Sequence, residues 1–393
     1  MTVNDRFAAL GIDNAPGQQA PVQKTGERVM DFSHGDVDAF PPASGAIEAV
    51  NEAYLAGSGR AYSPYRGHGD LLNEVADKLA GFTGAPVDPA NGLMITPGTQ
   101  GGLFLALSAI VEPGDKVAIV EPDYFANRKI IAFLGGRIVP VALDYEDVSA
   151  PATVDVERIE DAARSGTKLL VFSNPNNPTG VVYTQDQIRA IVSIAQMHGM
   201  FVVVDQLYSR LIYPGQSFTH LRASGIDPAN CLTLMGPSKT ESLSGFRTGV
   251  AMGPAPILDR MEQILAIHSL RTAGYNQAVL TTWFNEPEGW LEQRVEEHQD
   301  LRNDLVSLFR SVDGVAVRPT EGGSYLFPKL PEMGIPAGAF CESLRLEDSI
   351  VVTPGAEFSP HHAASIRLNF SQDRHRAVAA VESIVQRIEE RTR

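Results

Sequence analysis

Short apolar runs alternate with helical patterns along most of the chain. Most of these runs are continuously apolar instead of alternating with polar residues. Strands with this pattern are buried on both faces, as in a mainly parallel sheet that is covered by helices on both sides. We therefore expect an α/β fold with central strands at KVAIV (116–120), RIVPVAL (137–143), KLLVF (168–172), FVVVD (201–205), CLTLM (231–235) and GVAM (249–252).

Helices are predicted where apolar residues recur every three or four positions. This spacing occurs over 103–111, over 188–195 and over a C-terminal stretch from about 374 to 390. Thr184 and Gln187 form a capping-box pattern just before the second stretch, which predicts the start of that helix. Helices therefore lie between the predicted strands, as an α/β fold requires.

The length of the chain, 393 residues, predicts two domains, because a single hydrophobic core stops growing at roughly 250–300 residues. The predicted strands place a large domain at about 45–270. We expect a smaller α/β domain formed by 31–44 together with 271–393, with a bridging helix at about 276–310. The polar start, 1–30, is expected to be an N-terminal arm.

Composition and charge exclude several classes of function. The net charge of -15 argues against a surface for nucleic acid or anionic lipid, which would need clustered basic residues. Cys231 and Cys341 lie far apart without metal-ligand spacing, so we expect neither a disulfide framework nor a metal site. The start carries no export signal, and no apolar run approaches the ~20 residues of a spanning helix. We expect a cytoplasmic protein.

Ligands of open α/β sheets bind beyond the carboxyl ends of the strands, so polar residues that follow apolar runs are candidates for chemistry. The segment ITPGTQGG (95–102) is a glycine-rich turn with a helix predicted to open at about Gly101. Free backbone N–H groups and the helix dipole favour phosphate there, although an ordinary strand-to-helix turn has the same composition. The turn matches neither GxxxxGK[ST] nor GxGxxG, so an NTPase or dinucleotide site is not supported.

Two further candidates follow the next predicted strands. SNPNNPTG (173–180) has two prolines and a glycine, which make a rigid loop, and three asparagines that offer amide donors. Asp205 ends the run FVVVD, three residues before Tyr208. A carboxylate after four apolar residues is costly without a cationic partner. A helix N-cap is the alternative interpretation of Asp205.

The last candidate is Lys239 in GPSKTESLSGFRTG (236–249), with Arg247 eight residues later. Taken alone, each of these two residues would be interpreted as a surface cation. Taken in order along the chain, the candidates are a phosphate-binding turn, an amide donor, a buried acid, a tyrosine and a lysine. These are the groups that a pyridoxal phosphate site requires.

With these motifs, the chain resembles the fold-type-I, class I/II aminotransferases, the family of aspartate and aromatic aminotransferases. The resemblance extends from about residue 28 to 385 and depends on NPNNPTG, D-x-x-Y and S-K-x7-R-x-G in combination. It implies a three-layer α/β fold with a mainly parallel sheet and a smaller α/β domain. It also implies pyridoxal phosphate as cofactor and a homodimer.

The resemblance assigns roles around the cofactor ring. Lys239 matches the lysine that forms a Schiff base with the cofactor, and Asp205 matches the acid that pairs with the pyridinium nitrogen. Tyr208 and Asn177 match the groups that hydrogen-bond the phenolic oxygen of the ring, and Asn177 also belongs to the substrate site. Tyr124, in EPDY, falls where the family stacks an aromatic side chain on the ring.

The resemblance also assigns a set of residues to the phosphate group: Gly98, Thr99, Gln100 and Arg247. One departure from the family lies next to this set. The family usually has serine three residues before the lysine, and this chain has Gly236. Ser238 remains as a hydroxyl donor, so we expect a phosphate site that is altered on one side.

Substrate-binding residues are assigned in the same way. Arg367, in IRLNFS, matches the arginine that binds the α-carboxylate of the substrate, and Gly35 falls at the family's glycine near that carboxylate. Tyr62 matches a tyrosine that reaches the phosphate of the partner subunit. Tyr65 is the alternative, because aminocyclopropane carboxylate synthases have their tyrosine there. Arg271 lies near the position where dicarboxylate-specific members bind the distal carboxylate across the interface.

The resemblance implies a pyridoxal-phosphate-dependent aminotransferase that exchanges an amino group between an L-amino acid and a 2-oxo acid. A lyase or cyclising synthase on the same fold is the alternative, because only the side-chain pocket would differ. A cofactor-bound transcription regulator is disfavoured, since only about 30 non-basic residues precede the fold. A nicotinamide dehydrogenase lacks support without the glycine fingerprint.

Overall fold

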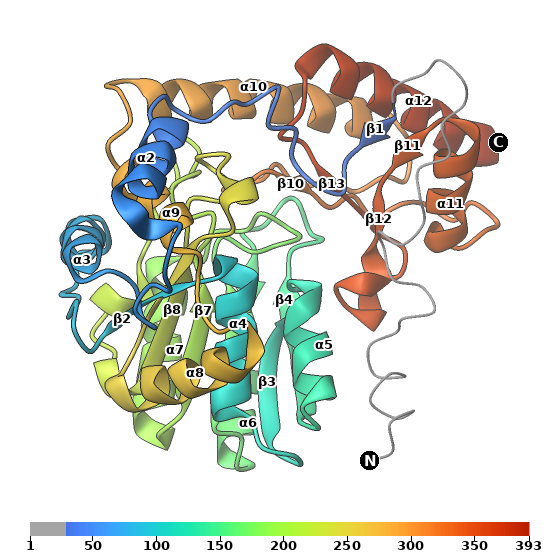
Figure 1. Ribbon diagram of the computed structural model, residues 1–393. Helices are drawn as coiled ribbons and strands as arrows, with labels where there is room; N and C mark the ends of the chain where they lie inside the picture. The colour runs from blue at the N-terminus through green and yellow to red at the C-terminus, as the bar shows by residue number, and fades with distance from the viewer. Residues whose placement is uncertain (1–28, 393) are drawn as a thin grey trace.

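The computed structural model describes residues 29–392, and the predicted N-terminal arm therefore lies almost entirely outside the described residues. A sheet of eight strands forms its centre (Figure 1). From β8 to β4 neighbouring strands are parallel, whereas β2, β9 and β5 pair antiparallel at the two edges. The strand order is β2 (Leu93–Thr96), β9 (Gly249–Met252), β8 (Cys231–Met235), β7 (Phe201–Asp205), β6 (Leu169–Ser173), β3 (Lys116–Glu121), β4 (Arg137–Asp144) and β5 (Thr153–Val154).

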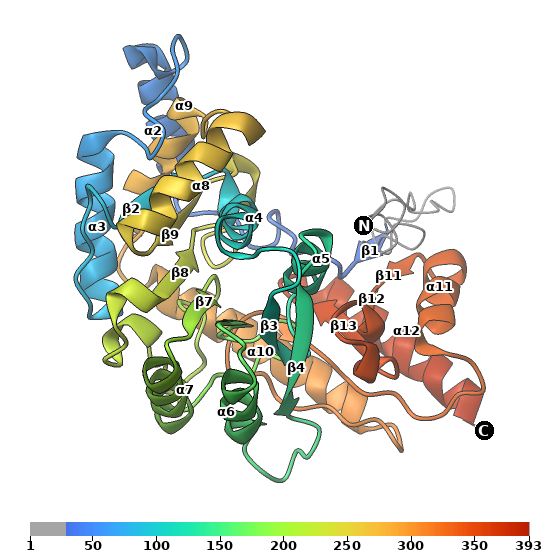
Figure 2. The ribbon, with the colours of Figure 1, turned by 90° about the horizontal axis from the view of Figure 1, so that it is seen from below.

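Helices cover both faces of this sheet, which confirms the predicted α/β fold (Figure 2). Successive side chains of a strand point to opposite faces. Val117 and Ile119 of β3 pack with α4 (Gly98–Ile110), α5 (Phe125–Phe133) and α8 (Ala255–His268). Ala118 and Val120 of the same strand point to the opposite face, where they pack with α6 (Val156–Arg164) and α7 (Gln185–His198). This alternation explains why the strand sequences are apolar throughout.

Apart from the bridging helix, the predicted strands and helices are confirmed with small changes at their ends. The capping box of α7 is formed, because Thr184 Oγ1 accepts from Gln187 N and Gln187 Oε1 accepts from Thr184 N. Helix α4 begins at Gly98, about one turn before the predicted Gly101. The C-terminal helix is α12 (Arg374–Thr392).

The C-terminal part of the chain has a hydrophobic core of its own, which includes Phe309, Phe340 and Ile384. Its strands and helices are β10 (Tyr325–Leu326), β12 (Thr353–Pro354), β13 (Ile366–Asn369), α10 (Trp290–Arg310), α11 (Ala337–Glu347) and α12. Near the N-terminus, β1 (Met30–Asp31) pairs with β11 (Ile350–Val351) and brings Phe32 into the same core. The division into two domains, with boundaries at about 45 and 270, stays a prediction.

The predicted bridging helix at about 276–310 is wrong in its first half. The structure has α9 (Gly274–Gln277) and the 3₁₀ turn η6 (Ala278–Thr281), and α10 begins only at Trp290. Pro287 and Gly289, whose φ is 80°, lie just before Trp290, and both residues oppose a continuous helix.

The remaining helices lie at the edges of the molecule. Helix α2 (Ala46–Ala53) continues into the π-helical turn η2 (Tyr54–Ser58), and α3 (Gly69–Thr83) packs beside β2. Short 3₁₀ turns are η3 (Leu221–Ala223), η4 (Pro228–Asn230), η5 (Ser244–Phe246), η7 (Gly355–Glu357) and η8 (Pro360–His362). Within residues 29–392, every helix is too short or too polar to cross a membrane.

Candidate active site

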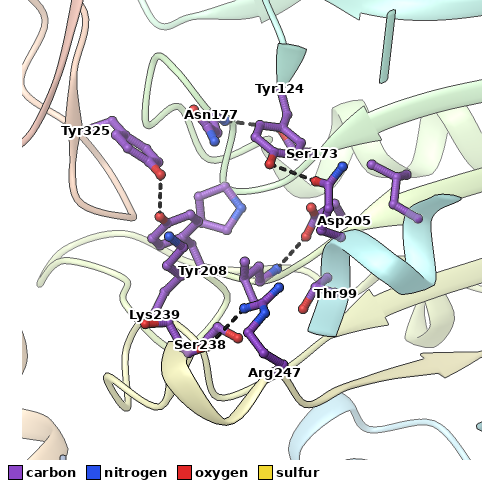
Figure 3. Close-up of a pocket in the computed structure, with 15 residues that line it drawn as sticks. Thr99, Tyr124, Ser173, Asn177, Asp205, Tyr208, Ser238, Lys239, Arg247 and Tyr325 are labelled. Carbon is purple, nitrogen blue, oxygen red and sulfur yellow. Dashed lines mark hydrogen bonds between the residues drawn. The ribbon is translucent and has the colours of Figure 1, made fainter. Parts of the chain in front are cut away.

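The carboxyl ends of the parallel strands meet at one edge of the sheet and surround a cavity of about 130 Å³ (Figure 3). The topology predicts this location, because residues that follow neighbouring parallel strands share an edge. Nine of the residues singled out in the sequence line the cavity: Thr99, Gln100, Tyr124, Asn177, Asp205, Tyr208, Ser238, Lys239 and Arg247.

Glycines let the phosphate-site candidates approach one another closely. Gly98 has a φ of 75°, and a Cβ atom there would lie 2.5 Å from Nη2 of Arg247. A Cβ atom on Gly236 would lie 3.0 Å from Oγ1 of Thr99 and 3.1 Å from Cα of Gly249. The departure from the family at position 236 therefore has a structural reason here: it lets the end of β8 pack tightly against the start of α4.

Two hydroxyl groups of residues that line the cavity have no hydrogen-bond partner among the described residues. They are Oγ1 of Thr99, in the first turn of α4, and Oγ of Ser238, and both atoms are buried. The Arg247 guanidinium lies at the same end of the cavity. Buried polar groups are normally paired, so unpartnered donors at a helix N-terminus beside an arginine fit an anionic group such as phosphate.

A buried ion cluster stabilises the loop that carries Lys239. Arg210 Nη1 donates to Glu241 Oε1 at 2.6 Å and to Glu286 Oε1 at 2.7 Å. Burial raises the pKa of Glu241 to about 7, against the opposing effect of Arg210. Because Glu241 is only two residues after Lys239, the cluster fixes the loop that carries the lysine.

Asp205 is a carboxylate at the cavity wall. Its Oδ1 accepts from Leu207 N at 2.9 Å, and no helix begins there, so the N-cap interpretation of Asp205 is wrong. Burial raises the pKa of Asp205 to about 6, while the Leu207 amide and the charge of Lys239 act in the opposite direction. A carboxylate with a raised pKa, facing a lysine across a cavity, is a candidate for chemistry.

Tyr208 has a partner that the sequence did not reveal. Its hydroxyl is hydrogen-bonded to the hydroxyl of Tyr325, with 2.6 Å between the two oxygens, and both side chains line the cavity. Tyr325 belongs to β10, in the C-terminal part of the chain. In the sequence it stands in the apolar stretch SYLF, where it resembles a core residue. The charges of Lys239 and Arg367 lower the pKa of Tyr325 despite its burial.

Arg367 is buried directly behind the cavity wall. Its Nη1 donates to Asn177 Oδ1 at 3.2 Å and its Nη2 donates to Ser33 O at 2.9 Å. The guanidinium packs on the rings of Tyr325 and Phe358, 4.5 and 4.7 Å from their centroids. Its Nε has no partner among the described residues. Arg367 thus keeps one donor unused beside Asn177.

A second cavity of about 110 Å³ lies on the other side of Lys239. Gly35, which the resemblance places near the substrate, lines this second cavity together with Lys239 and Tyr208. His34 also lines it, and its hydrogen bond to Asp31 raises the pKa of the imidazole to about 8. The lysine is therefore accessible from two adjoining polar spaces.

Tyr62 and Arg271 are not among the described residues that line either cavity. The Arg271 guanidinium packs on the ring of Tyr65, 3.1 Å from its centroid, and its Nε donates to Ser63 O at 2.8 Å. Tyr62 is 77% exposed. The structure therefore brings Tyr62, Tyr65 and Arg271 together, but away from the cavity of their own chain.

A sheet of this topology, with a lysine, an acid and a phosphate-type turn at its carboxyl edge, is typical of the fold-type-I enzymes. The family model described as aminotransferase class I and II matches residues 27–384, so the chain belongs to that family. The crystal structure of an aspartate aminotransferase from Rhodobacter sphaeroides is 49% identical, covers 100% of both chains and superimposes with a TM-score of 0.93.

Curated relatives are named for the same activity. An aspartate aminotransferase from Sulfolobus acidocaldarius is 27% identical over 94% of this chain and 91% of its own. An aspartate/prephenate aminotransferase from Thermus thermophilus is 28% identical over 92% of this chain and 91% of its own. These findings confirm the family, the fold and the transferase activity predicted from the sequence. Enzymes of this family depend on pyridoxal phosphate.

Proposed function

We propose that this aminotransferase holds pyridoxal phosphate at Lys239 and moves an amino group between an acidic L-amino acid and a 2-oxo acid. The observation that carries the proposal is the single cavity in which Lys239 faces Asp205 while the unpartnered hydroxyls of Thr99 and Ser238 lie beside Arg247. One end of the cavity thus suits a phosphate group and the other a protonated ring nitrogen.

Several residues that line the cavity would bind the cofactor. Thr99, Ser238 and Arg247 would donate to the phosphate oxygens, with the N-terminus of α4 adding its dipole. The Asp205 carboxylate would accept a hydrogen bond from the protonated ring nitrogen, and this cationic partner would lower the carboxylate pKa from its raised value. The hydroxyl of Tyr208 would bind the phenolic oxygen of the ring.

The remaining groups would act on the substrate. Bound pyridoxal phosphate supplies a conjugated electron sink that stabilises negative charge at the substrate Cα. Arg367 and the amide of Asn177 would bind the α-carboxylate, because a guanidinium donates two parallel hydrogen bonds to such a group. Nζ of Lys239, once the incoming amine has released it, would take the proton from Cα and move it to the cofactor, which is general acid–base work.

We propose that the preferred amino donor is aspartate or another dicarboxylic amino acid. The names of the relatives support this substrate class, since the protein that is 49% identical over the whole chain is called an aspartate aminotransferase. Arg271 supports it as well, provided that it reaches the site of a second subunit. A desolvated arginine suits a distal carboxylate, with which it can form two charge-assisted hydrogen bonds.

We also propose a homodimer. Leu55, Tyr62 and Ile267 are 76%, 77% and 88% exposed, and they lie around η2, the 62–65 segment and the end of α8. Tyr54 and Tyr275 extend this apolar surface, with ring centroids 6.0 Å apart. Exposed apolar surface of this kind marks an interaction site, and symmetric dimers are the commonest oligomers. A fully active monomer of 42.4 kDa in sedimentation would contradict the dimer.

The test of the proposed reaction is a half-reaction without an acceptor. The loaded enzyme is mixed with L-aspartate alone, and the absorbance of the cofactor and the 2-oxo acid released are both measured. The proposal predicts one equivalent of 2-oxo acid per site, no ammonia, and recovery of the starting spectrum after 2-oxoglutarate is added. Continuous release of 2-oxo acid with ammonia would indicate a lyase and contradict the proposal.

A further inference from the structure

Asp123 is a buried carboxylate that follows β3, next to the proposed ring-stacking residue Tyr124. Its side chain is 1% exposed. Oδ1 accepts from Ser173 Oγ at 2.5 Å and from Tyr124 N at 2.6 Å, and Oδ2 accepts from Ser173 N at 2.8 Å. Across residues 29–392, no lysine, arginine or histidine forms an ion pair with it.

A carboxylate in this position is costly for the fold. Burial without a cation disfavours the charged form, and burial raises the pKa of Asp123 to about 7 in spite of its three hydrogen bonds. Asp205 ends β7, two strands away in the order β7-β6-β3, and its charge adds to this effect. Burying a neutral side chain at this position would cost less free energy than burying a carboxylate, so stability does not explain why the residue is an aspartate.

The hydrogen bonds of Asp123 lead to two residues of the active site. One branch ends directly on the backbone N–H of Tyr124. The other passes through Ser173, whose Oγ accepts from Asn177 N at 3.0 Å. Asn177 Oδ1 in turn accepts from Arg367 Nη1 at 3.2 Å. A continuous chain of hydrogen bonds thus joins one buried carboxylate to the stacking tyrosine and to the proposed substrate arginine.

Another residue already fixes the rest of the 173–180 loop. Asn176 Nδ2 donates to Pro122 O at 3.1 Å, and Asn176 Oδ1 accepts from Thr179 Oγ1 at 2.6 Å. Asp123 and Ser173 are therefore not required merely to attach the loop to β3. Their particular contribution is to fix the position of Asn177 within it.

We propose that Asp123 is a positioning residue, which aligns Tyr124 over the ring and, through Ser173, aligns Asn177 and Arg367 for the substrate carboxylate. This inference depends on the proposed function, because it concerns how well that site binds its ligands. It assigns to Asp123, which does not line the cavity, a role that acts through other residues; Ser173 connects it to Asn177 and itself lines the cavity.

Asp123→Asn tests this inference most directly. The amide keeps the size of the carboxylate but replaces one acceptor oxygen by a donating NH₂ group. Either Ser173 N–H or Tyr124 N–H then faces another donor, so the arrangement must shift. Glu121→Gln is the matched control, because Glu121 is a buried carboxylate at the end of β3, two residues before Asp123, and it accepts from Arg128 and from Ser359 Oγ, away from Asn177.

The measurement is the dissociation constant of maleate, an unreactive dicarboxylate, from the absorbance change of the loaded enzyme, together with the Tm of each variant. We expect Asp123→Asn to weaken maleate binding at least tenfold and Glu121→Gln to change it less than twofold, even if both lower the Tm. Ser173→Ala should weaken binding in the same direction, and the double variant should add little, because coupled residues are not additive.

The outcomes separate this inference from the proposed function. A wild-type protein that binds no pyridoxal phosphate would overturn the proposed function and this inference with it. A wild-type response to maleate that is unchanged in Asp123→Asn, or equally weakened in Glu121→Gln, would overturn the inference alone. If Asp123→Asn does not fold, Ser173→Ala decides, because it removes the hydroxyl that connects Asp123 to Asn177 and keeps the carboxylate with its backbone hydrogen bonds; unchanged maleate binding in Ser173→Ala would overturn the inference.

Discussion

The hydroxyl oxygens of Tyr208 and Tyr325 lie 2.6 Å apart at the wall of the cavity, with their rings at 72° to each other. Tyr208 follows the central strand β7, whereas Tyr325 comes from β10 in the C-terminal part. The pair has two hydroxyl hydrogens and uses one of them in the mutual bond. In this structure the Tyr208 hydroxyl donates to Tyr325. If both hydroxyls turn so that Tyr325 donates instead, the hydrogen of Tyr208 is left for an acceptor in the cavity.

We therefore predict that Tyr325→Phe weakens catalysis without unfolding the enzyme. The loss in kcat/KM should be roughly tenfold or less, because a single hydrogen bond contributes about 1 kcal/mol. The pH titration of the cofactor absorbance should also shift, since Tyr208 would lose its partner. Tyr213→Phe is the control, because it removes a buried hydroxyl that donates to Gly323 O outside the cavity. Equal effects of the two substitutions would contradict this role for Tyr325.

Asp205→Asn should have opposite effects on activity and on stability. Activity should fall by several orders of magnitude, because an amide cannot keep the ring nitrogen protonated. In the cofactor-free protein, burial raises the pKa of Asp205 from 3.8 to about 6, so the folded state binds the proton more tightly than the unfolded state. The wild type therefore loses stability as the pH rises from about 4 to about 6, and the variant lacks this loss.

The corresponding measurement is urea unfolding of both cofactor-free proteins between pH 4 and pH 7. The free energy of unfolding of Asp205→Asn, relative to the wild type, should increase with pH and level off above about pH 7. Asp123 also has a raised pKa, but it is present in both proteins, so its contribution largely cancels when the free energies of unfolding are subtracted. A difference that is constant over this range, or that decreases, would show that the carboxylate is not held at a raised pKa.

Six of the eight strands of the central sheet were predicted from the sequence, whereas its edge strands β2 and β5 and the smaller strands were not. The six apolar runs that the sequence analysis assigned to strands became β3, β4, β6, β7, β8 and β9, because helices cover both faces of the sheet. By contrast, β1, β10, β11 and β12 have two residues each, too few to show any periodicity. Their pairing depends on distant segments, as when Met30 pairs with Ile350.

The same distinction applies to the site. Lys239, Asp205 and Asn177 follow recognisable strand ends, and motif spacing located them in advance. Tyr325 stands among apolar neighbours and becomes part of the cavity only because β10 packs against Tyr208. Asp123 directly precedes Tyr124, but the sequence gives no sign that Ser173 will lie beside it. Local sequence patterns carry no information about contacts between segments that are far apart in the chain, so these two contacts could not be predicted.

If each active site of the proposed dimer contains residues of both subunits, mixing two inactive variants should restore activity in part. If Arg271 acts in the partner's site, a hybrid dimer of Lys239→Ala and Arg271→Ala contains one site with both residues. Random pairing should then give about one quarter of wild-type activity towards a dicarboxylic substrate, because half of the dimers are hybrids and each has one intact site. Activity that stays at the level of the separate variants would contradict a contribution from the partner.

Arg271→Ala should also change substrate selectivity. The loss in kcat/KM for aspartate should correspond to about 2–5 kcal/mol, the cost of leaving one charge of a buried pair without its partner. Alanine and aromatic amino acids should be affected far less, since they carry no distal carboxylate. Equal losses for all substrates would instead mean that Arg271 acts through its packing on Tyr65.

The most direct test of the whole account is to locate the bound cofactor. The purified enzyme is reduced with borohydride and digested, and its peptides are mapped by mass spectrometry. We predict a pyridoxyl group on Lys239 and on no other lysine, and no cofactor absorbance in Lys239→Ala, whose fold should survive. A wild-type protein without cofactor absorbance, or with the label on a different lysine, would contradict the central claim.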